Sequence, residues 1–119
     1  MATILIIDDH PDVREVLRIM LEVAGHRVID AVSGTEGLAA FREHKPDLTM
    51  TDLRLPDMEG TDVVHALRQI DRVCPIVMVS AEHPEELEAI TLGAKAVPTL
   101  SKPFTRQRLL AIVEQALKT

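Results

Sequence analysis

The chain has 119 residues, of which 46% are hydrophobic and 27% charged, and its formal net charge at pH 7 is −6. This length suits one domain with one core, and the composition excludes disordered, collagen-like and low-complexity chains. The acidic balance opposes a nucleic-acid backbone, and Phe41 and Phe104 are the only Phe, Tyr or Trp residues that can stack on bases. We therefore expect one domain over residues 1–119, without an effector domain, that does not by itself bind nucleic acid.

The sequence lacks the patterns of export and membrane insertion. Its longest aliphatic stretches, 4–7 and 75–79, are far shorter than the ~20 residues that span a bilayer. Asp8 and Asp9 follow the first apolar run, where a signal peptide would carry a small-residue cleavage site. Cys74 is the single cysteine, so it forms no intrachain disulfide and we expect it to be a small buried hydrophobic residue. A cytoplasmic protein is predicted.

Five short apolar runs predict five strands that are buried on both faces, because the runs lack the alternation of a half-exposed sheet. Pro98 lies inside the last run and cannot donate a backbone hydrogen bond, which favours an edge position for that strand. The predicted strands cover residues 3–7, 27–32, 47–51, 76–80 and 96–100.

The segments between these runs carry helical periodicity. Val16 and Ile70 are among the apolar residues expected on the inner helix faces. Ser33 and Glu36 form a capping-box pattern, in which each side chain accepts from a free backbone donor of the other. The predicted helices cover residues 11–24, 33–45, 61–72, about 84 to the residue before Gly93, and 105–118.

The alternation of five strands with five helices predicts an α/β fold with a parallel sheet and right-handed crossovers. A flavodoxin-like (βα)5 three-layer sandwich with sheet order 2-1-3-4-5 puts the strand near Pro98 at an edge. In such sheets the functional crevice lies outside the carboxyl ends of the strands, where the strand order reverses. The residues that end the strands are therefore the candidates for function.

Polar residues end four strands that are neighbours in this order. Asp8 and Asp9 end the first strand, Asp52 the third and Ser80 the fourth, and Lys102 follows the fifth. Each residue taken singly also fits a helix cap, a turn or a solvated charge, but their convergence at one edge favours a single site. Three carboxylates and one ammonium give a local charge of about −2, which is costly without a bound cation. Oxygen ligands with room for water suit Mg²⁺ better than zinc or calcium.

The chain has five histidines that could act as further ligands. His10 follows the acidic pair and can lie near the site, but we favour a solvated loop position for it. No metal-ligand spacing relates His26, His44, His65 and His83, so they receive no role.

Several segments together form a specific pattern: 4–9 (ILIIDD), 46–60 (PDLTMTDLRLPDMEG), 79–81 (VSA), 93–94 (GA) and 102–104 (KPF). With this pattern the chain resembles the receiver domain of two-component response regulators, such as the chemotaxis regulators, over essentially its whole length. The resemblance implies that Asp52 is the phosphoacceptor and that Asp8, Asp9 and Asp52 hold Mg²⁺ with the backbone carbonyl of Arg54.

The resemblance also assigns the other residues of the site. It implies that Ser80 and Lys102 contact the phosphoryl group and that the peptide bond between Lys102 and Pro103 is cis. The implied protein is a signalling domain that catalyses its own phosphorylation and slow autodephosphorylation. Its implied partners are a sensor histidine kinase or histidine phosphotransfer protein, and an effector at the face of helix 4, strand 5 and helix 5.

Two features depart from the family pattern. Thr99 stands where receivers usually carry Tyr or Phe, and Gly93 and Lys102 are about two residues further apart than usual. Ile90, Pro98 and Thr99 are the expected contact residues of the output face. Without an aromatic ring to move, we expect the backbone of residues 80–84 and 93–102 to carry the switch.

Three other functions are disfavoured by the sequence. A haloacid-dehalogenase-like phosphohydrolase requires an acid two residues after its nucleophile, and His10 stands at that distance from Asp8. A flavodoxin is disfavoured because Asp8 and Asp9 would repel the phosphate of its cofactor. A receiver fold that has lost phosphorylation and acts only as an interaction module is disfavoured because all the site residues are present.

Overall fold

The structure, a computed structural model, describes residues 2–81 and 97–118. Its sheet has the order β2-β1-β3-β4-β5, and every neighbouring pair is parallel. This topology confirms the predicted flavodoxin-like α/β architecture. The strands are β1 (Thr3–Ile7), β2 (Arg27–Ala31), β3 (Leu48–Asp52), β4 (Ile76–Ser80) and β5 (Thr99–Ser101).

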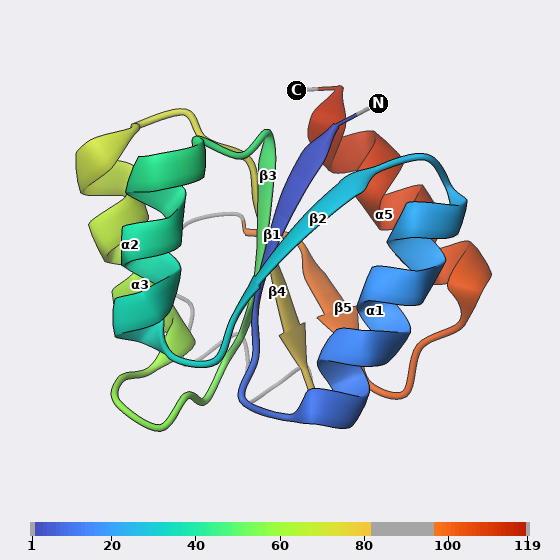
Figure 1. The fold of residues 1–119 in the computed structure, drawn as a ribbon, viewed down its shortest axis with the longest axis horizontal. Helices are drawn as coiled ribbons and strands as arrows, with labels where there is room; N and C mark the ends of the chain where they lie inside the picture. Colours follow the sequence, from blue (N-terminus) through green and yellow to red (C-terminus); the bar gives the residue numbers. More distant parts are fainter. Residues whose placement is uncertain (1, 82–96, 119) are drawn as a thin grey trace.

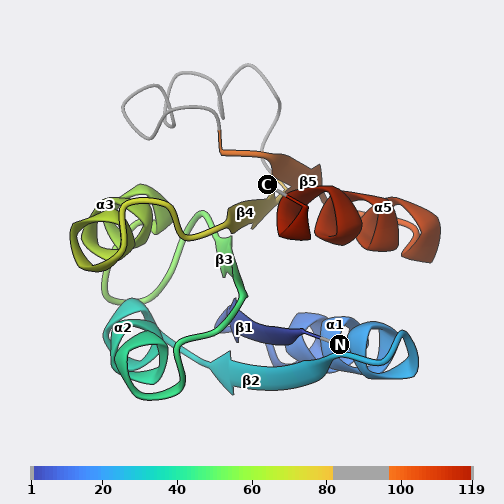
Figure 2. The same ribbon diagram turned by 90° about the horizontal axis from the view of Figure 1, so that it is seen from above.

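Helices cover both faces of the sheet (Figures 1 and 2). The helices α1 and α5 lie on one face, and α2 and α3 lie on the other. The predicted fourth helix, from about residue 84 to the residue before Gly93, lies outside the described residues. The described helices are α1 (Pro11–Val23), α2 (Gly34–His44), α3 (Gly60–Ile70) and α5 (Arg106–Leu117).

The sheet divides the core into two layers, as the interior strand β1 shows. Ile4 and Ile6 belong to the layer under α1 and α5, whereas Leu5 and Ile7 belong to the layer under α2 and α3. All four side chains are at most 1% exposed, so β1 is buried on both faces, as its unbroken apolar run predicted. Cys74 is also buried, as expected.

Two helical residues that were expected in the core are largely exposed. Val16 is 43% exposed and Ile70 is 41% exposed. Leu17 points inward from α1, and successive helical residues are about 100° apart around the axis, so Val16 lies on the flank of the helix. Ile70 is the last residue of α3, one turn beyond the buried Leu67.

The edge strand begins later than predicted. Thr99 opens β5, so Pro98 lies just before the strand and not inside it. The Pro98 carbonyl still accepts a hydrogen bond from the Met78 amide at 2.8 Å. Proline has no backbone N–H, so it can join the hydrogen bonds of a sheet only through its carbonyl. The strand β5 lies at the edge of the sheet, as Pro98 predicted.

The start of α2 differs in one detail from the predicted capping box. The Ser33 hydroxyl accepts from the Glu36 amide at 3.1 Å, as expected. The Glu36 carboxylate, however, accepts from the Val32 amide at 3.3 Å and not from that of Ser33.

Among the described helices, none is long and apolar enough to cross a membrane.

Candidate functional site

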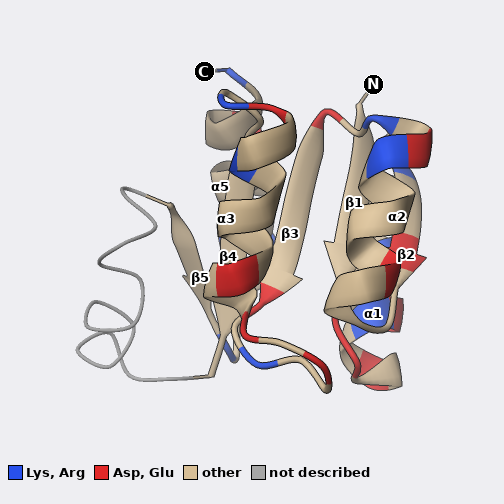
Figure 3. Ribbon diagram, turned by 90° about the vertical axis from the view of Figure 1, so that its left-hand side faces the viewer, with Lys and Arg blue, Asp and Glu red and all other residues tan. Residues whose placement is uncertain are grey.

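The polar residues predicted for the site meet at the carboxyl edge of the sheet. Figure 3 shows acidic positions at the ends of β1 and β3 at this edge. Asp52 and Ser80 are the last residues of β3 and β4, and Asp8 follows β1 directly. Asp8 and Ser80 are 1% exposed and Asp52 is 7% exposed, although all three are polar. Neighbouring parallel strands thus bring together residues that are far apart in the sequence.

Lys102 supplies the positive charge at this edge. Ser101 pairs with Ser80 across β4 and β5, and the Lys102 amide donates to the Ser80 carbonyl at 2.8 Å. The Lys102 ammonium then lies 3.2 Å from Asp8 Oδ2 and 3.6 Å from Asp52 Oδ2. Its side chain is only 17% exposed, so the ammonium is held within the site. The peptide bond from Lys102 to Pro103 is cis, as the resemblance implied.

The two carboxylate oxygens of Asp52 have different surroundings. Oδ1 accepts a hydrogen bond from the Leu53 amide at 2.7 Å, whereas Oδ2 faces Lys102. Burial raises the pKa of Asp52, the Lys102 ammonium opposes this rise, and the charge of Asp8 adds to it. Asp52 is therefore a carboxylate whose charge depends on cations beside it.

Asp8 is fixed by the turn between β1 and α1. Its Oδ1 accepts from the His10 amide at 2.8 Å, and its Oδ2 faces Lys102. Arg14, in the first turns of α1, donates to the backbone carbonyl of Asp8 at 2.8 Å. These bonds hold the acidic pair at the end of β1 while the chain turns into the helix.

The structure places His10 in an exposed loop position, as expected, and also brings its ring next to the acidic pair. The His10 side chain is 60% exposed, but its Nδ1 lies 2.8 Å from Asp8 Oδ1 and 3.2 Å from Asp9 Oδ1. Its hydrogen bond to Asp8 raises the pKa of the His10 imidazole. The position of His10 in the sequence indicates this proximity, because a residue between the acidic pair and Pro11 at the start of α1 must lie at the edge of the sheet.

These side chains fit a divalent cation. One possible ligand atom from each of Asp8, Asp9, His10 and Asp52 lies within 4.8 Å of the others. Three of the four are carboxylates, the hard oxygen donors that Mg²⁺ prefers. Asp9 is the more open member of the acidic pair, with 38% of its side chain exposed. Among the described residues, this cluster is therefore suited to hold a metal ion beside Asp52.

The loop after β3 folds back against the end of the strand. The Leu55 amide donates to the Met58 carbonyl, the Gly60 amide donates to the Leu53 carbonyl, and Arg54 pairs with Glu59 through an isolated antiparallel bridge. A Cβ at Gly60 would overlap the backbone carbonyl of Asp52, so the close return requires glycine here. Arg54, whose carbonyl the resemblance implies as a metal ligand, lies in this loop two residues after Asp52.

Asp57 attaches this loop to the start of α2. Its carboxylate accepts from the amides of Gly34 and Thr35 at 2.8 and 2.9 Å and from the Thr35 hydroxyl at 2.6 Å. These donors lower the pKa of Asp57 to about 2. The negative charge also suits the positive end of the helix dipole. Asp57 was not singled out in the sequence, because the bonded residues are more than 20 positions away.

We expect Asp57→Asn to lower stability at neutral pH, because the amide is uncharged and accepts more weakly from the α2 amides. In the wild type the ionised Asp57 stabilises the fold above its ordinary pKa of 3.8, and this contribution is lost as the pH falls through about 2. Urea unfolding at pH 7 and pH 2.5 measures the difference between the proteins, which should be smaller at pH 2.5. A difference that is equal at both values would contradict the role of the charge.

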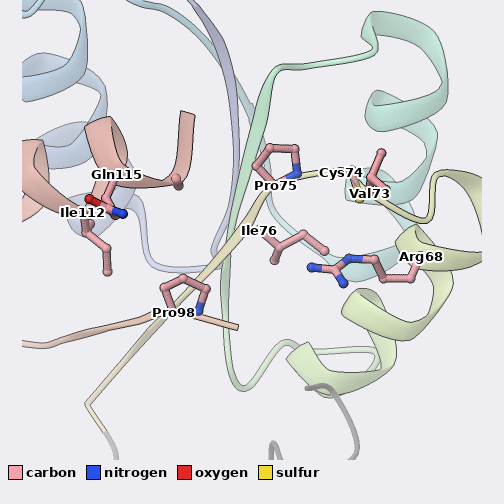
Figure 4. Close-up of a pocket in the computed structure, with 9 residues that line it drawn as sticks. Arg68, Val73, Cys74, Pro75, Ile76, Pro98, Ile112 and Gln115 are labelled. Atoms are coloured by element: carbon pink, nitrogen blue, oxygen red, sulfur yellow. The ribbon is translucent and has the colours of Figure 1, made fainter. Parts of the chain in front are cut away.

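A separate cavity of about 290 Å³ lies at the opposite end of β4 (Figure 4). Its lining includes Arg68, Cys74, Ile76, Pro98 and Ile112. None of the acidic residues of the candidate site lines it. The cavity is therefore distinct from the cluster at the carboxyl edge.

The predicted output face is described only in part. Thr99 is half-buried at the start of β5, and its hydroxyl lies 3.5 Å from the Val97 carbonyl oxygen. Ile90, most of residues 80–84 and the segment from Gly93 to residue 96 lie outside the described residues. The expected backbone switch stays a prediction.

The comparisons with known proteins agree with this geometry. Residues 4–114 match the family of response regulator receiver domains. The transcriptional regulatory protein KdpE of Mycobacterium tuberculosis is 38% identical over 118 residues, which cover 99% of this chain and 52% of the relative. KdpE of Escherichia coli shows the same identity and coverage. The chain thus spans about half the length of these curated relatives.

Solved structures with the same fold match nearly the whole chain. A putative response regulator from Chloroflexus aurantiacus has a TM-score of 0.93 and 32% identity, and the match covers 99% of this chain and 98% of that one. The chemotaxis response regulator CheY4 of Vibrio cholerae has a TM-score of 0.90 and 30% identity, with 98% of both chains covered.

Proposed function

The chain belongs to the response regulator receiver domains of two-component systems, and we propose that it takes a phosphoryl group onto Asp52 in a Mg²⁺-dependent reaction. The observation that carries the proposal is the position of Asp52. Its buried carboxylate ends β3 beside the Lys102 ammonium and the carboxylates of Asp8 and Asp9. Phosphoryl transfer requires little beyond positioning and neutralisation of charge, and these groups supply both.

Asp52 acts as the nucleophile through one of its carboxylate oxygens, and the Leu53 amide, which donates to Oδ1 at 2.7 Å, fixes the orientation of the carboxylate. The bond from this oxygen to phosphorus forms as the bond from phosphorus to the leaving nitrogen of a phosphohistidine breaks, and that nitrogen takes up a proton from water. Asp8, Asp9, Asp52 and the Arg54 carbonyl would hold Mg²⁺. When bound, the ion supplies positive charge to the phosphoryl oxygens.

Lys102 and Ser80 complete the site on the side of β4 and β5. The ammonium is already within 3.6 Å of Asp52 Oδ2, so it can pair with a phosphoryl oxygen after little movement. The buried Ser80 ends the neighbouring strand and offers a hydroxyl at the same edge. Ala81 follows Ser80, is exposed and is small, which leaves the entry to Asp52 open.

The phosphodonor we propose is a phosphohistidine on a sensor kinase or phosphotransfer domain. The helix α1, which begins beside the acidic cluster, carries an exposed apolar stripe of Val16, Ile19 and Val23. These residues are 43%, 53% and 68% exposed, and they recur at the spacing of one helix face. The stripe suits a helix of the donor that brings its phosphohistidine to Asp52.

As the partner that receives the signal, we propose an effector that binds at the face that includes β5 and α5.

A Mg²⁺-dependent labelling experiment tests the proposal. The wild-type chain, incubated with acetyl phosphate or a phosphohistidine donor, should incorporate one hydroxylamine-labile phosphate on Asp52, and chelation of Mg²⁺ should prevent this.

Asp9→Ala should weaken Mg²⁺ binding by tenfold or more, because few carboxylates remain to offset dehydration of the ion. Calorimetric titration of both proteins measures the affinity. Equal Mg²⁺ affinities would contradict the metal assignment, and phosphate stable to hydroxylamine would contradict the acyl phosphate.

A further inference from the structure

His10 places a ring nitrogen among the three carboxylates of the site. Its Nδ1 lies 2.8 Å from Asp8 Oδ1, 3.2 Å from Asp9 Oδ1 and 3.6 Å from Asp52 Oδ2. Because an ionised carboxylate only accepts hydrogen bonds, Nδ1 carries a hydrogen in this arrangement. The imidazole N–H is thus held by the same carboxylates that would hold a metal ion.

The separations of His10 Nδ1 from the three carboxylates fall in the range of ligand atoms around one ion. In an octahedral site with bonds of about 2.1 Å, adjacent ligand atoms are about 3.0 Å apart and opposite ones about 4.2 Å apart. The three distances from His10 Nδ1 run from 2.8 to 3.6 Å. The imidazole therefore stands at the spacing of a fourth ligand.

We propose that His10 is a ligand for borderline transition-metal ions, such as Ni²⁺ and Zn²⁺, and that it shifts the preference of this site toward them and away from Mg²⁺. The inference rests on the proposed function, because it concerns the ion held beside Asp52. Imidazole nitrogen is a good ligand for Zn²⁺ and Ni²⁺, whereas Mg²⁺ prefers oxygen and retains water. When an ion binds through Nδ1, the ring carries its hydrogen on Nε2.

His10 acts in opposite directions on the two classes of ion. For Ni²⁺ or Zn²⁺ it adds a nitrogen ligand to three carboxylates. For Mg²⁺ it adds no suitable donor, and its N–H competes with the ion for the oxygens of Asp8 and Asp9. Removal of the imidazole should therefore weaken the binding of one class and leave the other unchanged or tighter.

Calorimetric titrations of the full chain with Ni²⁺ and with Mg²⁺ test this difference. We expect His10→Ala to weaken Ni²⁺ binding about tenfold or more, the lower end of the usual cost of disturbing a metal site, without weakening Mg²⁺ binding. His65→Ala, which removes an exposed histidine of α3 outside the cluster, is the matched control and should change neither affinity. Zn²⁺ should also shift the ¹⁵N resonance of His10 Nδ1, whereas Mg²⁺ should not produce the shift of direct ligation.

Every outcome bears on the inference. Selective loss of Ni²⁺ affinity in His10→Ala, with the shifted His10 resonance, would support it. Equal changes for Ni²⁺ and Mg²⁺, or no change for Ni²⁺, would overturn it. Asp9→Ala separates this result from the proposed function, because it should weaken both ions. If Asp9→Ala weakens both and His10→Ala weakens neither, the proposed metal site stands and the role of His10 fails. A wild type that binds neither ion would overturn both.

Discussion

Asp52→Asn should abolish phosphate incorporation completely, with either a phosphohistidine donor or acetyl phosphate. The amide has no anionic oxygen to attack phosphorus, and the described site places no other carboxylate where both Lys102 and the Leu53 amide converge. Asparagine has nearly the same shape as aspartate, so the Leu53 bond and the packing of β3 should remain. Intact-protein mass spectrometry after incubation with donor and Mg²⁺ measures the loss. Label retained in the variant would refute Asp52 as the phosphoacceptor.

The same variant should be more stable than the wild type at neutral pH. Burial and the charge of Asp8 raise the pKa of Asp52 in the folded chain, so the folded state loses stability as the pH rises from 3.8 through that raised pKa. Asparagine never ionises and escapes this loss. Thermal unfolding at pH 7 should give a higher melting temperature for Asp52→Asn, and the advantage should shrink near pH 3.

Glu43→Gln is the control for a general effect of net charge. Glu43 is exposed on α2, where its carboxylate lies 3.8 Å from His44. Its replacement changes the charge of the chain as much as Asp52→Asn does, but at a solvated position. We expect little change in its melting temperature. A stabilisation equal to that of Asp52→Asn would show that net charge, and not the buried site, is the cause. The ionised Asp52, our proposed phosphoacceptor, is thus expected to lower the stability of the fold.

The strand ends explain why so much of the site could be predicted from the sequence. Continuous apolar runs identify strands buried on both faces, and parallel pairing then brings their carboxyl ends to one edge. Asp8, Asp52 and Lys102 follow such runs, so their proximity depends only on the sheet order and not on details of side-chain packing. The resemblance assigned their roles, but the topology already placed them together.

Other features of the structure cannot be predicted from the periodicity of the sequence. The ring of His10 points toward the acidic pair, with a contact of 2.8 Å between its Nδ1 and Asp8 Oδ1. A histidine whose ring pointed into solvent would have the same sequence pattern, so the sequence does not predict this contact. Asp57 caps a helix that begins more than 20 residues earlier, so no local capping motif reveals it. Val16 fits an apolar stripe, yet it lies on the flank of α1 because the buried stripe is narrow. Side-chain direction and long-range caps require the structure.

Lys102→Ala should separate metal binding from phosphoryl transfer. The Lys102 ammonium lies 3.2 Å from Asp8 Oδ2 and 3.6 Å from Asp52 Oδ2, where it competes with a metal ion for carboxylate oxygens. Its removal should leave Mg²⁺ affinity unchanged or higher. The rate of phosphorylation should nevertheless fall by about 10²–10³-fold, the usual cost of losing one group that stabilises developing charge on the transferred oxygens.

The pKa of Asp52 provides a third measurement on this variant. The Lys102 charge lowers that pKa against the effect of burial, so its removal should raise the pKa further. A ¹³C carboxyl titration without Mg²⁺ measures this, and Lys118→Ala is the control because Lys118 is 68% exposed and pairs with Glu114 on α5. An unchanged Asp52 pKa would contradict the coupling to Lys102. A collapse of Mg²⁺ affinity would mean that Lys102 organises the carboxylates and does not compete for them, whereas an undiminished rate would exclude Lys102 from phosphoryl transfer.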